Sequence, residues 1–388
     1  MSAPSLPLGE DYPEIRAEVA KICAGYPGAY WRELEEKQAY PDTFVRALTY
    51  SCYLAALIPE DHGGAGLPLR AAAVILETIH RQGCNAGACH AQMYIMGTLL
   101  RHGSAEQKRR WLPEIAAGRL RLQAFGVTEP TSGSDTPALK TRAVRRGDRY
   151  VVHGQKVWTS RALASDLMLL LARTTPLEQV KKRSDGLSVL LVDLRGAKGV
   201  EIRPLKAMIN HNTTEVFFDG LEVPVENLIG AEGKGFRYIL DGMNAERILL
   251  SGEAIGDARW FVATSSAYAR ERHVFGRPIG QNQGIQFPLA RAHAETEAAD
   301  LVARRAAALF DAGQDCGADA NMAKLLASEA SWHAAEACMQ TFGGFGFARE
   351  YDVERKWRET RLFQTAPIST NLVLAHLAQH VLGLPKSY

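Results

Sequence analysis

The chain has 388 residues, which is too long for one ordinary core and predicts two or three domains. Hydrophobic residues make up 46% of it, a globular proportion, and the net charge of +2 gives no electrostatic reason to expect a nucleic-acid partner. No apolar run is long enough to cross a bilayer and no secretory leader is present, so we expect a cytoplasmic protein without a membrane association.

Helical patterns fill the first third of the chain. Alanine-rich, apolar-periodic stretches run from about residue 69 to residue 101. The stretch "SAEQKRRWLPEIAAG" begins with a capping box formed by Ser104 and Gln107, and Gly118 ends the helix that this box opens. We therefore predict an N-terminal α-helical domain over residues 1–121.

Short strand-like runs follow, separated by Gly, Pro, Asn and Asp. They include "RLQAFGV", "RYVVHGQKVW", "SDLMLLLA", "GLSVLLVD", "GVEIRPL" and "TEVFFDGLEV". Helices do not alternate with these runs, so a parallel Rossmann sheet is not expected. We predict a central domain over residues 122–231 that is an antiparallel β-barrel or sandwich.

Long helical patterns return after the strands, over about 235–272, 283–312 and 318–341. Residues 232–388 are therefore predicted to form a C-terminal domain that resembles a four-helix bundle, and the fold class is α+β. The stretch "GGFGF" could be mistaken for a dinucleotide fingerprint. That motif requires a preceding strand in a βαβ unit, and here a helix precedes it.

Six cysteines are scattered along the chain. Cys84, Cys89 and His90 come nearest to a metal-ligand set, but the paired spacing of a zinc site is missing. We therefore expect no metal, and we interpret these cysteines as small buried residues on a helix. A disulfide framework is not expected in a long chain of this kind.

Four segments, in this order, resemble the FAD-dependent acyl-CoA dehydrogenase family. They are "FGVTEPTSGSD" (125–135), "GQKVWTSRA" (154–162), "RERHVFGRPIGQNQGIQF" (270–287) and "CMQTFGGFGFAREYDVERKWRETR" (338–361). The resemblance implies a homotetramer of three-domain subunits, each with one FAD. Such an enzyme oxidises an acyl-CoA thioester at its α and β carbons and passes the electrons to an electron-transfer flavoprotein.

The resemblance also implies roles for individual residues. Those implied to bind FAD are Val127, Thr128, Ser134, Trp158, Ser160, Arg272, Phe275, Gln283, Gln340, Gly343, Gly344, Ser369 and Asn371. Those implied to bind the substrate are Ser134, Met93, Tyr94, Met243 and Arg247. Taken singly, such residues are more often core or surface residues, and it is their joint placement that favours a cofactor. The bulk of Met93, Tyr94 and Met96 indicates a short or branched acyl group.

The reaction requires a carboxylate that faces the α-proton of the substrate. In many members of the family this base is a glutamate in the C-terminal loop, at the position where this sequence has Pro367. In others, of the isovaleryl-CoA dehydrogenase type, a glutamate precedes an arginine on the helix that opens the third domain. Glu246 precedes Arg247 here and is the predicted base, although such a glutamate is more often a solvated ion-pairing residue.

Pro367 raises a second question because proline has no backbone N–H. The resemblance implies that the N–H at this position helps to hold the thioester carbonyl, and the loss of one such donor typically costs on the order of 3 kcal/mol. Ile368 could present its N–H instead, or a flavin hydroxyl and another donor could suffice. Alternatively, the substrate is not an ordinary acyl-CoA.

Other functions stay open on the same scaffold. One is a flavin oxidase or monooxygenase that reacts with oxygen, against which the retained Glu246 argues. Another is a non-catalytic flavin-binding subunit, which Pro367 motivates. A carrier-protein thioester could also replace the CoA thioester, and the sequence does not decide between them.

Overall fold

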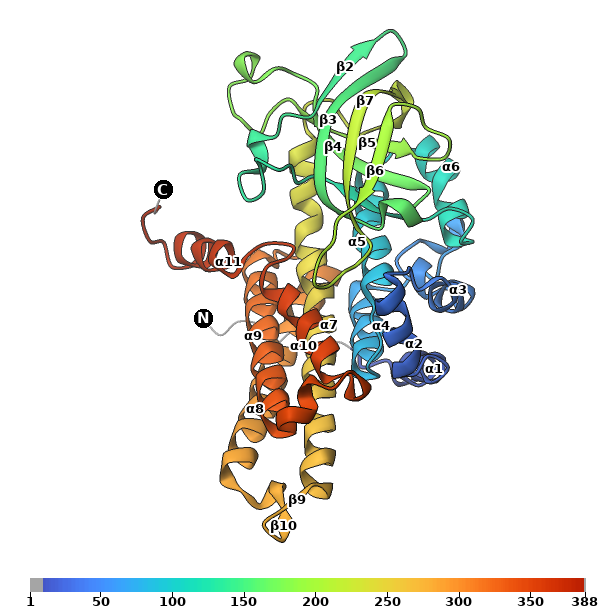
Figure 1. Cartoon of the computed structure of the whole chain (residues 1–388). Helices are drawn as coiled ribbons and strands as arrows, with labels where there is room; N and C mark the ends of the chain where they lie inside the picture. The colour runs from blue at the N-terminus through green and yellow to red at the C-terminus, as the bar shows by residue number, and fades with distance from the viewer. Residues whose placement is uncertain (1–9, 387–388) are drawn as a thin grey trace. The chain divides into compact units, whose positions relative to one another are not determined.

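The computed structural model describes residues 10–386 (Figure 1). Its α-helices are α1 (Pro13–Ala24), α2 (Gly28–Lys37), α3 (Asp42–Tyr50), α4 (Leu69–Arg81), α5 (Gly87–His102), α6 (Ala105–Ala116), α7 (Gly235–Glu271), α8 (Gln283–Asp311), α9 (Gly317–Phe342), α10 (Val353–Arg361) and α11 (Thr370–His376). Its strands are β1 (Leu122–Gly126), β2 (Arg142–Arg146), β3 (Arg149–Ser160), β4 (Leu167–Arg173), β5 (Leu187–Asp193), β6 (Val200–Pro204), β7 (Thr213–Pro224), β8 (Leu228–Ile229), β9 (His273–Val274) and β10 (Arg277–Pro278). The predicted order of helices, then strands, then helices is confirmed.

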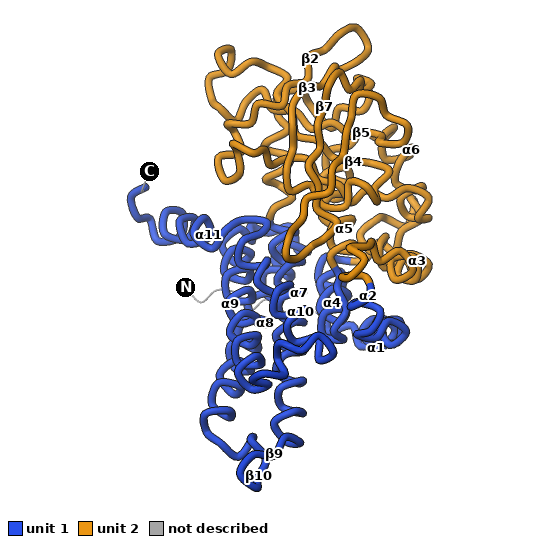
Figure 2. Tube along the Cα trace, in the orientation of Figure 1, with its two compact units in different colours: residues 1–33, 68–86, 244–388 blue, residues 34–67, 87–243 orange. Residues whose placement is uncertain are grey.

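The described residues divide into two compact units (Figure 2). Unit 1 is largely helical and takes the described parts of residues 1–33, 68–86 and 244–388. Unit 2 takes residues 34–67 and 87–243 and contains the large sheet with α3, α5 and α6. The three predicted domains divide the chain differently and stay a prediction.

Eight strands form the sheet of unit 2, in the order β6-β7-β3-β2-β4-β5-β8 with β1 beside β4. Most neighbours are antiparallel, as predicted. The pair β1–β4 and the contact of β2 with β4 are parallel, so the sheet is mixed and not purely antiparallel. The β2–β3 hairpin lies between β1 and β4 in sequence, and this excursion lets the chain re-enter the sheet in the direction of β1.

Strand β4 is buried on both faces. Leu167, Leu169 and Leu171 belong to an apolar cluster that includes residues of α5 and α6. Met168 and Leu170 belong to a second cluster built mainly from strand residues. The two sets alternate because successive strand side chains point to opposite faces. This explains why the strand reads as a continuous apolar run in the sequence.

The predicted capping box of α6 is confirmed. The Gln107 N–H donates to the Ser104 hydroxyl at 3.1 Å, and the Ser104 N–H donates to the Gln107 side-chain oxygen at 2.9 Å. The Gln107 amide nitrogen also donates to the carbonyl oxygens of Glu226 and Leu228, at 2.7 and 2.8 Å. The box therefore both starts the helix and attaches it to the segment around β8.

Unit 1 is built around the long helices α7, α8 and α9, with α10 beside them. Their shared core combines small residues such as Ala258, Ala292 and Ala334 with Phe261 and Phe342. Small residues let helices approach closely, and the aromatic rings fill the remaining space. Within the described residues, no helix combines the length and the apolar character that crossing a membrane would require.

The cysteine prediction needs one correction. Cys89 lies on α5, but Cys84 lies in the connection that precedes this helix and not on a helix itself. Both side chains are buried. The thiol of Cys84 lies 3.7 Å from the carbonyl oxygen of Tyr26, within unit 1. Cys84 therefore packs within the connection between α4 and α5.

Candidate active site

A buried ion pair joins the two cofactor segments that the sequence predicts in unit 2. Lys156, on β3, is fully buried, and its Nζ donates to Glu129 Oε1 and to the carbonyl oxygen of Val127, both at 2.9 Å. Glu129 also accepts the backbone N–H groups of Lys140 at 2.6 Å and Thr141 at 2.9 Å. The pair therefore fixes the backbone at Val127, one of the predicted flavin contacts.

The electrostatics of this pair follow from its burial. Burial lowers the pKa of Lys156 to about 8, although the charge of Glu129 opposes the shift. Burial alone would raise the pKa of Glu129, but the charge of Lys156 and the N–H donors hold that pKa below its usual value. Both groups stand in the segments that resemble the family, yet the sequence analysis gave them no role. The available signal was a charged residue inside a strand-like apolar run.

Trp158 lies in an irregular part of β3. The pairing of β3 with β7 shifts register between Lys156 and Thr159, and Trp158 has φ 60°. A positive φ is uncommon for a bulky residue and costs on the order of 1–3 kcal/mol. Trp158 is nevertheless 60% exposed. The fold therefore maintains a strained conformation that presents an apolar ring, which suits a residue that meets a ligand.

Ser160 follows two residues later, where more of the backbone is unusual. Its hydroxyl accepts a hydrogen bond from Asn210 Nδ2 at 2.7 Å. Arg161 and Asn210 have φ 61° and 52°. Among the other predicted contacts, Ser134 is exposed and Thr128 is half-buried. Sequence reasoning missed Asn210, for which the sequence offered no signal.

The predicted acyl-chain residues of unit 2 differ in exposure. Met93 and Met96 on α5 are fully buried, and Met96 belongs to the apolar core. Tyr94 is half-buried, with its ring edge-on to Phe125 at a centroid distance of 5.7 Å. Met243, the last residue of unit 2, is half-buried. Core packing accounts for Met96, whereas the substrate roles of the others stay predictions.

Glu246 lies on the part of α7 that belongs to unit 1 and is 5% exposed. It is therefore not the solvated residue that a glutamate on an amphipathic helix usually is. Arg247 follows it, and its Nη1 donates to Asn244 Oδ1 at 2.9 Å. Burial lowers the pKa of Arg247, and the nearby Glu246 charge opposes that shift. A buried carboxylate thus stands beside a half-buried arginine.

Two further cofactor segments of unit 1 come together at the β9–β10 hairpin. Phe275 and Gly276 form its turn, with φ 52° and 76°, and the Phe275 ring is fully exposed. The guanidinium carbon of Arg272 lies 5.6 Å from the centroid of the Phe345 ring. Phe345 belongs to the short 3₁₀ turn that begins at Gly343, so this contact links the third and fourth matching segments.

The glycines of that turn leave room for a ligand. Gly343 has φ 58° and ψ −133°, a conformation that favours glycine. A Cβ added at Gly343 or Gly344 would meet no atom within 4 Å. Gln283 and Gln340 are exposed. Beside this region, α7 and α8 line a cavity of about 350 Å³, to which Ala269, Gly280, Gln286 and Leu289 contribute.

The C-terminal loop depends on a lysine that the sequence analysis missed. Lys324, on α9, is fully buried, and its Nζ donates to the carbonyl oxygen of Ile368 at 2.8 Å. Burial and the charge of Arg247 lower the pKa of Lys324 to about 8, and Glu329 partly offsets this. The signal was available as one lysine within the apolar helical run "NMAKLLA".

The other residues predicted in this loop have visible structural roles. The Ser369 hydroxyl accepts the N–H of Leu372 at 3.4 Å and caps α11. Asn371 is exposed in the first turn of that helix. The capping role does not test the predicted flavin contact of Ser369, which stays a prediction.

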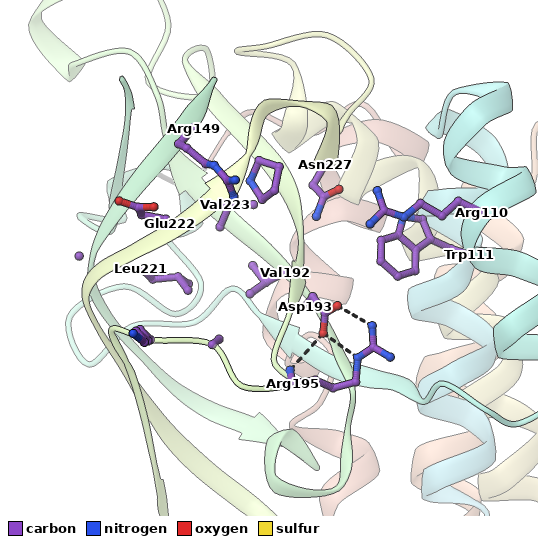
Figure 3. A pocket seen from close by; sticks show the side chains of 14 residues that line it. Arg110, Trp111, Arg149, Val192, Asp193, Arg195, Leu221, Glu222, Val223 and Asn227 are labelled. Atoms are coloured by element: carbon purple, nitrogen blue, oxygen red, sulfur yellow. Dashed lines mark hydrogen bonds and ion pairs between the residues drawn. The ribbon is translucent and has the colours of Figure 1, made fainter. Parts of the chain in front are cut away.

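A larger cavity, of about 530 Å³, lies in unit 2 and is lined by none of the predicted site residues (Figure 3). Its wall contains Arg110, Arg149 and an ion pair in which Arg195 Nε and Nη2 approach the Asp193 carboxylate at 2.9 and 2.6 Å (Figure 3). Most of this wall is polar and the ion pair is already formed. The cavity therefore has no part in the predicted chemistry.

Comparisons with known proteins cover almost the whole chain. Three family models match in order: acyl-CoA dehydrogenase N-terminal domain at residues 9–119, middle domain at 124–221 and C-terminal domain at 233–382. An acyl-CoA dehydrogenase of Mycobacterium bovis, fadE12, is 33% identical over 98% of both chains. The structure of a glutaryl-coenzyme A dehydrogenase in complex with glutaryl-CoA superposes with a TM-score of 0.90, 29% identity and coverage of 99% of this chain and 98% of the other. A structure described as the electron transferring flavoprotein of Acidaminococcus fermentans gives a TM-score of 0.91 at 27% identity, over 97% and 99% of the two chains.

Proposed function

The chain belongs to the acyl-CoA dehydrogenase family, and from that premise we propose that it binds FAD and oxidises an acyl-CoA with Glu246 as the base. The family consists of flavoprotein oxidoreductases that act on CH–CH groups.

The observation that carries the assignment is the burial of Glu246 on α7. Burying a carboxylate costs free energy, so a glutamate kept inside a helical unit calls for a purpose. Pro367 occupies the position where many relatives have their base, and its side chain cannot accept a proton. Glu246 is the carboxylate that the resemblance assigns as the alternative, and its burial supports that assignment.

In the proposed reaction the α-carbon loses a proton and the β-carbon loses a hydride. The Glu246 carboxylate takes the α-proton, and the electron pair of that C–H bond becomes part of the new double bond. When bound, FAD supplies the acceptor for the hydride. Donors at the thioester carbonyl stabilise the negative charge that develops on its oxygen during proton removal.

The residues present fit a flavin. In unit 2, the exposed indole of Trp158 and the backbone fixed by Lys156 and Glu129 offer an apolar surface and polar main-chain groups. In unit 1, Arg272 offers a cation for a diphosphate, and the open turn at Gly343 allows close approach of the backbone. The remaining predicted contacts are proposed to complete the cofactor site.

We also propose that the enzyme is a homotetramer and that an electron-transfer flavoprotein accepts its electrons. The fully exposed Phe275 and the cavity beside α7 and α8 support an interface between subunits at the hairpin. The second part rests on the family resemblance.

The test is an anaerobic titration of the yellow holoprotein with a series of acyl-CoA thioesters. We expect the flavin to bleach with short or branched acyl-CoAs, and we expect Glu246→Gln to slow bleaching by at least about 100-fold. Glu253→Gln is the matched control, because Glu253 is another buried carboxylate on α7. Its bleaching rate should stay near that of the wild type.

Two results would separate the parts of the proposal. If no acyl-CoA bleaches the wild-type flavin, the proposed activity is wrong. If the wild type bleaches and Glu246→Gln bleaches equally fast, the activity stands and the assignment of the base is wrong.

A further inference from the structure

We propose that Lys324 is a positioning residue, which holds Ile368 so that the N–H of Ile368 replaces the donor that Pro367 lacks at the thioester carbonyl. The inference rests on the proposed function and deepens it. It selects one of the explanations that the sequence left open for Pro367. The residues involved all lie within unit 1.

Hydrogen bonds hold the C-terminal loop at its start, middle and end. At its start, the N–H groups of Thr365 and Ala366 both donate to the carbonyl oxygen of Leu362 at 2.9 Å. At its end, the Thr370 hydroxyl donates to the carbonyl oxygen of Gln364 at 3.3 Å. Between these anchors, the bond from Lys324 to Ile368 attaches the middle of the loop to α9. The orientation of Ile368 therefore depends on Lys324.

The loop offers few backbone donors around Pro367. Pro367 contributes no N–H. In the part of the chain that the structure describes, the N–H of Ile368 donates to no protein acceptor, and Ile368 is half-buried. An N–H without a protein partner is costly unless water or a ligand accepts from it. It is the first N–H after the proline and thus the nearest replacement along the chain.

Within the described chain, the charge of Lys324 is not balanced by a nearby carboxylate. No carboxylate lies within ion-pair distance of its Nζ among residues 10–386. Arg247 on α7 repels it, and Glu329 on its own helix attracts it only from a distance. Arg247 also lies near His376 on α11, whose pKa is lowered by burial and by its neighbours His380 and Arg247. A lysine in this setting is not explained as half of a structural ion pair.

A carbonyl oxygen is therefore the partner that keeps Lys324 in place. Hydrogen bonds from a charged donor are about twice as strong as those between neutral groups. Such a bond at Ile368 restrains the peptide groups on both sides of this residue. The lysine touches neither substrate nor cofactor in this account, and it acts through the loop that it holds.

The experiment compares two ligands that differ in the thioester carbonyl. Crotonyl-CoA has the carbonyl and cannot be oxidised further, whereas S-butyl-CoA is a thioether without it. Binding of each to the holoenzyme is followed through the flavin absorbance. We expect Lys324→Met to weaken crotonyl-CoA binding on the order of tenfold and to change S-butyl-CoA binding less than about twofold. Equal effects on both ligands, or none, would overturn the proposal.

The control variant is Ser331→Ala. Ser331 is fully buried on the same helix, and its hydroxyl bonds that of Thr360 on α10, which precedes the loop. This variant should bind both ligands as the wild type does. Lys324→Arg, which keeps a cationic donor, should retain more of the preference for crotonyl-CoA than Lys324→Met.

A second measurement needs no mutation and stays informative if Lys324→Met fails to fold. Amide hydrogen exchange of the peptide over residues 363–372 is measured in the wild-type holoenzyme with each ligand. Crotonyl-CoA should protect the Ile368 N–H more than S-butyl-CoA does, and equal exchange with both ligands would contradict the inference. If neither CoA derivative binds, it is the proposed function that fails.

Discussion

Both units of this protein contain completely buried lysines, and Lys156 in unit 2 and Lys324 in unit 1 have opposite surroundings. Lys156 in unit 2 faces the Glu129 carboxylate at 2.9 Å. Lys324 in unit 1 faces the carbonyl oxygen of Ile368 and lies near the like charge of Arg247. The pKa of each is lowered to about 8. Similar titration behaviour therefore arises from two different arrangements.

The difference shows what each lysine contributes. Lys156 is one half of a pair, and its removal would leave Glu129 as an uncompensated buried charge. Lys324 has no such partner, and its removal would instead release a loop and relieve repulsion. We therefore expect mutations at Lys156 to act mainly on stability and mutations at Lys324 to act mainly on the binding of the thioester.

The largest expected effect on stability is at Lys156. Lys156→Met should lower the free energy of unfolding by about 3–5 kcal/mol, because it breaks a buried pair from one side. Urea denaturation of the holoprotein measures this change. The double variant Lys156→Met/Glu129→Gln should recover part of the loss. If the single variant is as stable as Lys181→Met, an exposed control in the same unit, the pair is not what holds the two segments.

Lys324→Met should have a smaller effect on stability. It removes one hydrogen bond from a charged donor, worth about 1.5 kcal/mol, and also removes repulsion from Arg247. In the same urea experiment, Lys324→Met should therefore lower the free energy of unfolding by at most about half as much as Lys156→Met does. A loss as large as that of Lys156→Met would mean that the two lysines serve the same structural purpose, and the comparison would fail.

The stability difference between the wild type and Lys324→Met should depend on pH, and this dependence tests the surroundings of Lys324. Its pKa is about 8 in the folded chain and near its usual 10.5 when unfolded, so the unfolded chain binds more protons between these values. The wild type should therefore gain stability relative to Lys324→Met as the pH rises. We expect about 1 kcal/mol between about pH 7.5 and about pH 9. If the stability of the wild type relative to Lys324→Met falls between these pH values, the pKa of Lys324 is not lowered in the folded chain.

The smallest effect on stability is expected at Phe275, which is exposed, unlike the two buried lysines. Phe275→Asn should raise the free energy of unfolding by about 0.5–1 kcal/mol, because asparagine tolerates the positive φ of this turn better than phenylalanine. The same variant should bind FAD more weakly, as measured by release of flavin on dilution. Unchanged flavin binding would remove Phe275 from the proposed cofactor site.

The sequence predicted those features that local pattern decides. The capping box at Ser104, the helix bounds around Glu246 and the apolar strand over residues 167–173 follow from short-range periodicity and composition. The resemblance added the family, which the comparisons confirm, whereas the cofactor role of its four segments stays a prediction. The parallel pairing of β1 with β4 was not predicted, because it depends on how the β2–β3 hairpin returns the chain to the sheet.

The sequence could not predict contacts between distant residues. Lys156 and Glu129 are 27 residues apart, and Lys324 and Ile368 are 44 apart. Each pair meets only once the sheet or the helices have formed. The positive φ angles of Trp158 and Phe275 likewise arise from a register shift and a tight hairpin, which residue type alone does not indicate.

The central claim is that the Glu246 carboxylate removes the α-proton, and hydrogen exchange at that carbon tests it apart from any electron acceptor. The holoenzyme is incubated in D₂O with a CoA thioester whose β-carbon carries no hydrogen, and deuterium at the α-carbon is followed by NMR. The wild type should introduce deuterium, and Glu246→Gln should do so at least about 100-fold more slowly. Equal exchange by both proteins would show that another group takes the proton.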